Sequence, residues 1–149
     1  MAEENKLVGG LNDKKHVEAV TARSNSDKEL MEKVKKLNMV LENLMLDVPG
    51  GIDRMVTWQI ERGKIVNATV EEKPAPSDWR KTKIDKKKVD FRATAKYDVS
   101  VGIHKGEQTS MMALMKGQYK MQGSMVKIMK MTPEMNAWNE VASTVPCEY

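Results

Sequence analysis

The sequence predicts an α+β fold, in which a helix comes first, several antiparallel strands follow, and helices with one further strand end the chain. Two patterns indicate this class. Apolar residues recur every three or four positions near residue 30 and again after residue 110, as in amphipathic helices. Between residues 55 and 97, apolar and polar residues alternate as in half-buried strands. With 149 residues, the chain has the length of one domain.

The N-terminal part divides at about residue 25. Residues 1–25 are polar and weakly periodic, so we expect an appendage that is partly disordered or holds a short helix over 13–22, outside a main domain at 26–149. Ser26-Asp27-Lys28-Glu29 has the spacing of a capping box, and apolar residues then recur at helical intervals. A helix over 26–38 is therefore predicted, with Leu30, Val34 and Leu37 on its buried face.

Three segments in the middle of the chain alternate as half-buried strands do. Arg62-Gly63 makes a tight turn between the first two, which predicts a β-hairpin. The third should be an antiparallel strand with one wet face. The residues expected to face the core are Val56, Trp58, Ile60, Val66, Ala68, Val70, Phe91, Ala93, Ala95 and Tyr97. The preceding segment, 39–47, fits either a continued helix or a strand.

Short elements follow the strands. A helix is expected over 107–116 and a strand over 118–122. Ser124 can cap the next helix, which carries Met125, Ile128 and Met129 on one side.

A separate last helix is expected over 133–144. Thr132-Pro133-Glu134 is typical of a helix start, because it combines a capping side chain, a proline in the first turn and an acid near the positive end of the helix dipole. Met135 and Trp138 share one face of this helix.

Few residues are suited to catalysis or metal binding. The chain has two histidines, His16 and His104, and one cysteine, Cys147, with no pair at the spacing of metal ligands. Nothing local orients either histidine toward the cysteine as a base, and no glycine-rich phosphate loop is present. We therefore expect no catalytic residue, no metal and no cofactor.

Positive charge is concentrated in one short run. The net charge is +4, and the run together with Asp85 carries +5. Its basic residues are Arg80, Lys81, Lys83, Lys86, Lys87 and Lys88. Such a run can meet anionic headgroups or phosphates, or be a solvated loop, and it lacks the aromatic or arginine-rich pattern that favours nucleic acid.

Two further features bear on location. The longest stretch without a charged residue, 108–115, is far shorter than the about 20 residues of a membrane-spanning helix. The opening Met1-Ala2-Glu3-Glu4 is not typical of a secretory signal, and the single Cys147 favours a reducing compartment. A cytoplasmic location is expected.

Methionine is the most unusual part of the composition. The chain has 13 methionines and one phenylalanine, and eight of the methionines lie between Met111 and Met135. Methionine adapts to irregular apolar shapes, so this group can be ordinary core or can line a deformable cavity or groove.

Several motifs together resemble the sterol carrier protein type two family. Lys116-Gly117-Gln118-Tyr119-Lys120-Met121-Gln122-Gly123-Ser124-Met125 is similar to the glycine, strand, glycine and capped helix that close that domain. Pro49-Gly50-Gly51, the Trp58 strand and Arg62-Gly63-Lys64 are similar to its first hairpin. The resemblance covers about 26–131. It implies a five-stranded, mostly antiparallel sheet with helices packed on one face around an apolar cavity, and it makes 39–47 the first strand.

The same resemblance implies a function. Proteins of that family hold sterols, fatty acids or fatty acyl-CoA without catalysis, so we expect a non-catalytic lipid carrier whose basic run touches anionic membrane transiently. The alternative is an interaction module whose methionine-rich face binds another protein or a second copy of the chain. The expected ligand contacts are Met111, Met112, Met115, Met121, Met125, Ile128 and Met129, together with Phe91 and Trp138 of the covering helix.

Overall fold

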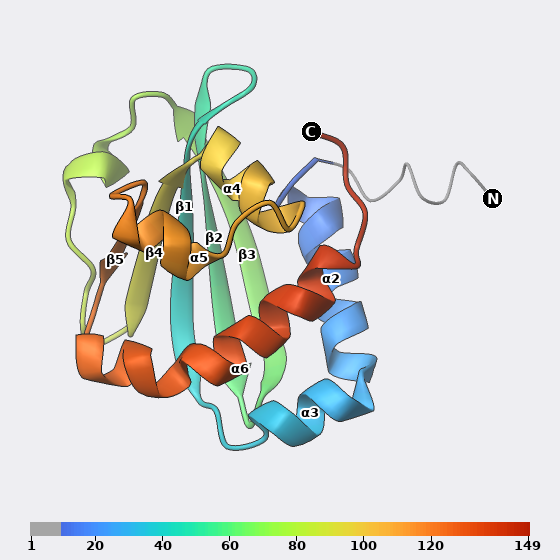
Figure 1. Ribbon diagram of the computed structural model, residues 1–149. Helices are drawn as coiled ribbons and strands as arrows, with labels where there is room; N and C mark the ends of the chain where they lie inside the picture. Colours follow the sequence, from blue (N-terminus) through green and yellow to red (C-terminus); the bar gives the residue numbers. More distant parts are fainter. Residues whose placement is uncertain (1–9) are drawn as a thin grey trace.

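The computed structural model describes residues 10–149, which form a five-stranded sheet with helices on one face (Figure 1). The strand order is β3-β2-β1-β4-β5. The strands are β1 (Met39–Val48), β2 (Ile52–Glu61), β3 (Lys64–Pro74), β4 (Phe91–Lys96) and β5 (Tyr119–Gln122). The helices are α2 (Lys14–Ser26), α3 (Lys28–Val34), α4 (Tyr97–His104), α5 (Ser110–Met115) and α6 (Met125–Ser143), with a short 3-10 helix, η1 (Asp78–Lys81). The predicted α+β class is confirmed, and the ambiguous segment 39–47 is the first strand.

The sheet is antiparallel except where β1 pairs with β4. The alternation in β4 predicted an antiparallel strand, and β4 is antiparallel only to β5. Because β3 lies at one edge of the sheet and runs in the same direction as β4, the chain between them must cross to the other end of the sheet. Residues 75–90 make this crossing, and they include the basic run.

A buried ion pair holds that crossing segment to the face of the sheet opposite the helices. The Asp53 side chain is fully buried and accepts hydrogen bonds from Ser77 and from Nε and Nη2 of Arg80, the latter two both at 2.8 Å. Arg80 also donates to Asp47 at 2.7 Å. Burial raises the pKa of Asp53, but the hydrogen bonds from Arg80 and Ser77 outweigh it and hold that pKa well below its usual range. Arg80 therefore stabilises the fold.

The hairpin contains one irregularity. Gln59 pairs with Asn67, whereas the next residue, Ile60, pairs with Ile65, so Val66 is an extra residue in a β-bulge. Val66 is consequently 48% exposed. The prediction that Val66 faces the core is wrong, because the bulge shifts the alternation by one position. Ala68 and Val70 pack against the core as predicted.

The N-terminal helix belongs to the core. The short helix expected near 13–22 is α2. It is part of the domain and not an appendage, because its Val17 and Val20 pack in the main hydrophobic cluster. Residues 1–9 lie outside the described part of the chain. The next helix, α3, is capped by Asp27, whose Oδ1 accepts from the backbone N–H of Leu30 at 2.9 Å, one residue later than the predicted Ser26.

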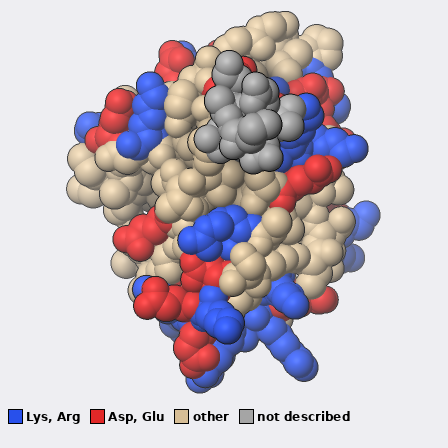
Figure 2. Space-filling model, turned by 90° about the vertical axis from the view of Figure 1, so that its right-hand side faces the viewer, with Lys and Arg blue, Asp and Glu red and all other residues tan. Residues whose placement is uncertain are grey.

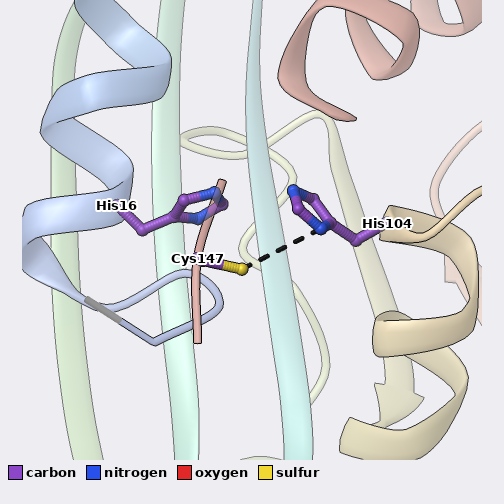
Figure 3. Close-up of side chains that lie close together, drawn as sticks. All are labelled: His16, His104 and Cys147. Atoms are coloured by element: carbon purple, nitrogen blue, oxygen red, sulfur yellow. Dashed lines mark hydrogen bonds between the residues drawn. The ribbon is translucent and has the colours of Figure 1, made fainter. Parts of the chain in front are cut away.

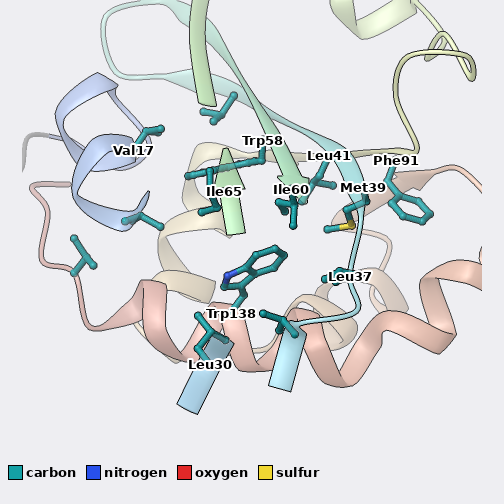
Figure 4. Packing of buried hydrophobic residues seen from close by; sticks show 14 of the residues in the cluster. Val17, Leu30, Leu37, Met39, Leu41, Trp58, Ile60, Ile65, Phe91 and Trp138 are labelled. Carbon is teal, nitrogen blue, oxygen red and sulfur yellow. The ribbon is translucent and has the colours of Figure 1, made fainter. Parts of the chain in front are cut away.

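The last two expected helices are one continuous helix. Ser124 caps α6 as predicted, but the helix passes through Pro133 without a new start. Pro133 has no N–H that could donate to the carbonyl of Met129. Met129 lies on the exposed side of α6, so water can replace the missing donor. The continuous helix places Ile128 and Trp138 against the sheet (Figure 4). No helix within residues 10–149 is both long enough and apolar enough to span a bilayer.

Candidate functional site

A cavity of about 170 Å³ lies between the sheet and the helices. In Figure 4, Trp138 projects from α6 toward Ile60 and Ile65 on the sheet. The cavity is comparable to engineered cavities of about 150 Å³ that stay dry and bind benzene. Its lining residues are Leu11, Asn12, His16, Val20, Ser24, Leu41, Asn43, Leu44, Met45, Trp58, Ile60, Ile65, Ala93, Ala95, Ser100, Ile103, His104, Ser110, Tyr119, Met135, Trp138, Asn139, Ala142 and Ser143.

The lining combines an apolar wall with polar groups. The period-two alternation of the strands turns Leu41, Trp58 and Ile60 inward, and these residues are buried. The helices and β5 add side chains with hydroxyl or ring nitrogen atoms, among them Tyr119. Burial raises the pKa of Tyr119 to about 12, so its phenol is neutral at physiological pH. The cavity therefore suits a molecule that is mainly apolar and has some polar atoms.

Two polar atoms of the cavity residues are buried without a partner. Ser24 Oγ and Trp138 Nε1 make no hydrogen bond to any described residue, and both residues line the cavity. The indole N–H can only donate. An unpaired buried polar group costs about 1–3 kcal/mol, so an oxygen that accepts from this N–H would bind favourably there.

The two histidines and the only cysteine lie close together (Figure 3), and both histidines line the cavity. His16 comes from α2, His104 from the end of α4 and Cys147 from the C-terminal segment. Their potential ligand atoms lie within 4.8 Å of one another, and the two imidazole rings meet edge to face at 5.2 Å between centroids. No local pattern in the sequence indicated this cluster.

Hydrogen bonds define the protonation of both rings. The backbone N–H of Asn12 donates to His16 Nδ1 at 3.0 Å, so the ring hydrogen is on Nε2, which lies 3.3 Å from the Val145 carbonyl oxygen. His104 Nε2 lies 3.1 Å from the same oxygen, and its Nδ1 accepts from the Tyr149 hydroxyl. Burial lowers the pKa of both histidines. Both rings are therefore neutral and both bind one carbonyl of the C-terminal segment.

This arrangement does not activate the cysteine or present metal ligands. Cys147 Sγ lies 3.9 Å from His104 Nδ1, whose lone pair already accepts from Tyr149. Burial raises the pKa of the Cys147 thiol, whereas a nucleophilic thiolate needs a lowered one. A metal at His16 Nδ1 would have to displace the N–H of Asn12. As placed, the cluster anchors the C-terminal segment.

The expected ligand contacts occupy three kinds of position. Trp138 lines the cavity, Phe91 and Ile128 are buried in the core cluster outside the lining, and Met121 packs partly buried against that cluster. The other five are exposed methionines: Met111 at 38%, Met112 at 45%, Met115 at 82%, Met125 at 50% and Met129 at 68%. The expected methionine-rich lining therefore differs from the lining observed, in which Met45 and Met135 are the methionines.

Sequence reasoning missed most of the lining. The inward strand positions Trp58, Ile60, Ala93 and Ala95 were expected to face a core, and the alternation that predicted this cannot distinguish a core from a cavity wall. The polar positions, such as Ser24 and Asn43, had no local signal, because their role depends on elements far apart in the chain.

Comparison with known proteins identifies the fold. No family model matches the sequence, and no curated protein matches it. Among solved structures, a conserved hypothetical protein from Thermus thermophilus, described as a possible sterol carrier protein, is similar with a TM-score of 0.75 and 16% identity over 96% of each chain. Sterol carrier protein 2 is similar with a TM-score of 0.65 and 17% identity, over 87% of this chain and 95% of that one. A palmitated sterol carrier protein 2-like protein from Aedes aegypti has a TM-score of 0.50 and 16% identity, over 85% of this chain and 90% of that one. The chain thus has the sterol carrier protein 2 fold that its motifs indicated.

Proposed function

We propose that this chain is a non-catalytic carrier that holds a single-chain amphipathic lipid, such as a fatty acid, in its cavity. The observation that carries the proposal is the mainly apolar cavity between the sheet and the helices, in a fold whose solved examples include a palmitated protein. Burial of apolar surface contributes about 25 cal/mol per Å², so an alkyl chain needs no polar contact to be held. The reducing, cytoplasmic location expected for a chain with the single Cys147 suits such a carrier.

We expect the polar end of the ligand to bind the two unpartnered groups, Ser24 Oγ and Trp138 Nε1. Ser24 Oγ–H and Trp138 Nε1–H can both donate to a carboxylate, carbonyl or hydroxyl oxygen. A ligand oxygen that reaches either group removes the cost of leaving that buried donor unpaired. A molecule with an alkyl chain and one oxygen-bearing end is therefore favoured over a pure hydrocarbon.

The cavity volume sets the manner of binding. At about 170 Å³ it holds only a short segment of a long alkyl chain. A long-chain ligand therefore has to enlarge the cavity, and α6 is the element that we expect to move. It lies across the sheet and contributes Met135, Trp138 and Asn139 to the lining (Figure 1). No catalytic step is assigned, because the contact between Cys147 and His104 does not activate the cysteine thiol.

Displacement of a fluorescent fatty acid by palmitate tests the proposal. The matched variants are W138F, which removes the unpaired N–H in the cavity, and W79F, which changes a tryptophan of η1 outside the lining. A charged hydrogen bond is worth about 1.5–3 kcal/mol, so W138F should weaken palmitate about 10- to 100-fold while W79F has no effect. Absence of fatty acid binding by the unsubstituted chain, or equal affinity in the two variants, would contradict it.

A further inference from the structure

Exposed apolar side chains gather on α5 and on the first turns of α6. They are Met111, Met112, Met115, Met125, Val126 and Met129, and we call this surface the methionine face. The two helices lie at opposite ends of the short strand β5, which forms one edge of the sheet (Figure 1). Single exposed apolar residues are common, but a group of large ones at one place marks an interaction surface.

The charged residues in this stretch of sequence all have one sign. Residues 108–133 contain four lysines, Lys116, Lys120, Lys127 and Lys130, and no aspartate or glutamate. All four lysines are exposed, and none forms an ion pair with a described residue. The methionine face is therefore apolar and positively charged together.

The basic run adds to the same edge. The backbone N–H of Ile84 donates to Oε1 of Gln122 at 3.2 Å, which places the middle of the run beside β5. In Figure 1 this segment descends past β5 toward the start of α6. Its five lysines, Lys81, Lys83, Lys86, Lys87 and Lys88, are exposed. Arg80 is excluded, because it is bound to Asp53.

The opposite edge of the molecule differs in charge pattern. On the side that carries α2 and α3, acidic and basic side chains are interspersed (Figure 2). Several of them pair there, as Arg23 does with Asp27 at 2.9 Å and Lys35 with Glu32 at 2.6 Å. The excess of lysine is thus a property of the β5 edge.

We propose that the methionine face and the lysines around it dock on the surface of a bilayer that contains anionic lipids. Flexible methionine side chains suit the irregular boundary between headgroups and acyl chains, and the lysines complement the negative headgroups. A second copy of the chain would bring the same lysines against one another, so charge favours the bilayer over self-association. The proposal adds a docking step to the proposed carrier: Ser110 of α5 and Tyr119 of β5 also line the cavity, which therefore reaches this edge.

Co-sedimentation of the full chain with vesicles tests the docking. Vesicles of phosphatidylcholine with about 30% phosphatidylserine should bind it, and pure phosphatidylcholine vesicles should bind it far less. Raising the salt from about 0.05 M to about 0.5 M should release it. The double variant M115S/M129S should lower the affinity at least tenfold, and K127Q/K130Q should lower it about 25-fold, because each lysine near such a surface contributes about fivefold.

Matched controls lie on β3, at the other edge of the sheet. V66S removes an apolar side chain that is 48% exposed, and K64Q removes an exposed lysine. Neither should change vesicle binding. Because Met115 and Met129 are exposed, M115S/M129S should retain the urea midpoint of the unsubstituted chain, which separates loss of docking from loss of fold.

Three outcomes would overturn the docking proposal. They are equal binding to neutral vesicles, equal losses in the β3 controls, and a concentration-dependent dimer that M115S/M129S dissociates while vesicles bind nothing. The last would make the methionine face a self-association surface. Fatty acid displacement is measured without vesicles, so its result and the docking result fail independently.

Discussion

Enlarging Ala93 should stabilise the empty chain and weaken lipid binding at the same time. Ala93 lies on the inner face of β4, is 4% exposed and lines the cavity. Its neighbours across the sheet are Asn43 in β1 and Met121 in β5. Replacing it with leucine places three more carbon atoms in the space that the ligand is proposed to occupy.

The cavity volume sets both magnitudes. At about 24 cal/mol per Å³, the cavity of about 170 Å³ corresponds to about 4 kcal/mol that complete filling could recover. Three buried carbons at about 0.8 kcal/mol each give about 2.4 kcal/mol, within that limit. Ala93→Leu should therefore raise the free energy of unfolding by about 2 kcal/mol. The same atoms displace about three methylenes of the ligand, which should weaken binding about 50-fold.

Urea unfolding of the ligand-free chain and displacement of a fluorescent fatty acid measure the two effects. Ala68→Leu is the control, because Ala68 lies on the inner face of β3 outside the lining. It should leave the affinity unchanged. The reasoning is refuted if Ala93→Leu destabilises the chain by about 1–3 kcal/mol, as overpacking does, and the affinity stays at that of the unsubstituted chain.

Two further predictions concern the anchors of the fold. Arg80→Ala leaves the fully buried carboxylate of Asp53 without its cation, and it should lower the free energy of unfolding in urea titrations by about 3 kcal/mol. This is the low end for a buried pair, because Arg80 is 28% exposed. An effect below about 1 kcal/mol would show that the pair does not hold the crossing segment. Burial lowers the pKa of His16 and His104 below 6.5, so the unfolded chain binds more protons than the folded chain below that pH. The free energy of unfolding should therefore decrease as the pH falls below 6.5. His104→Gln should make this loss shallower, and an unchanged pH profile would contradict the neutral rings.

Most of the sheet could be predicted from the sequence, and the exceptions have local causes. Period-two alternation identifies the inner face of β2 over 56–60 and of β4 over 91–95, because the pairing of these residues with β1 is continuous. Val66 defeats it, since a bulge inserts one residue without a glycine or proline to signal it. The parallel pairing of β1 with β4 also lay beyond the sequence, because alternation describes the two faces of a strand and not the direction of its neighbour.

Helix ends were ambiguous because adjacent residues can perform the same role. Ser26 and Asp27 both favour an N-cap, and the structure uses the aspartate, while the serine hydroxyl donates to the Arg23 carbonyl. Thr132-Pro133 fits a helix start, yet Thr132 donates to the Ile128 carbonyl inside a continuous α6. Burial of apolar groups on both sides of the proline outweighs the hydrogen bond that it removes.

The candidate site was harder to predict than the fold, for reasons of geometry. Consecutive helical residues point about 100° apart, so placing Ile128 in the core turns Met129 to the flank of α6, where it is 68% exposed. Spacing alone could not decide which of the two would face inward. The histidine cluster could not be predicted either, because Cys147 and His104 are 43 positions apart and meet only through the C-terminal segment.

The structure thus separates two surfaces that the composition suggested were one. The cavity wall is made mainly of tryptophan, aliphatic and polar side chains with two methionines, Met45 and Met135. The methionines of α5 and early α6 are exposed among lysines. If the first surface holds a lipid and the second meets a bilayer, their variants must act independently. Ala93→Leu should alter fatty acid affinity and leave vesicle binding unchanged, and M115S/M129S should do the reverse. A single surface serving both roles would lose both properties in either variant.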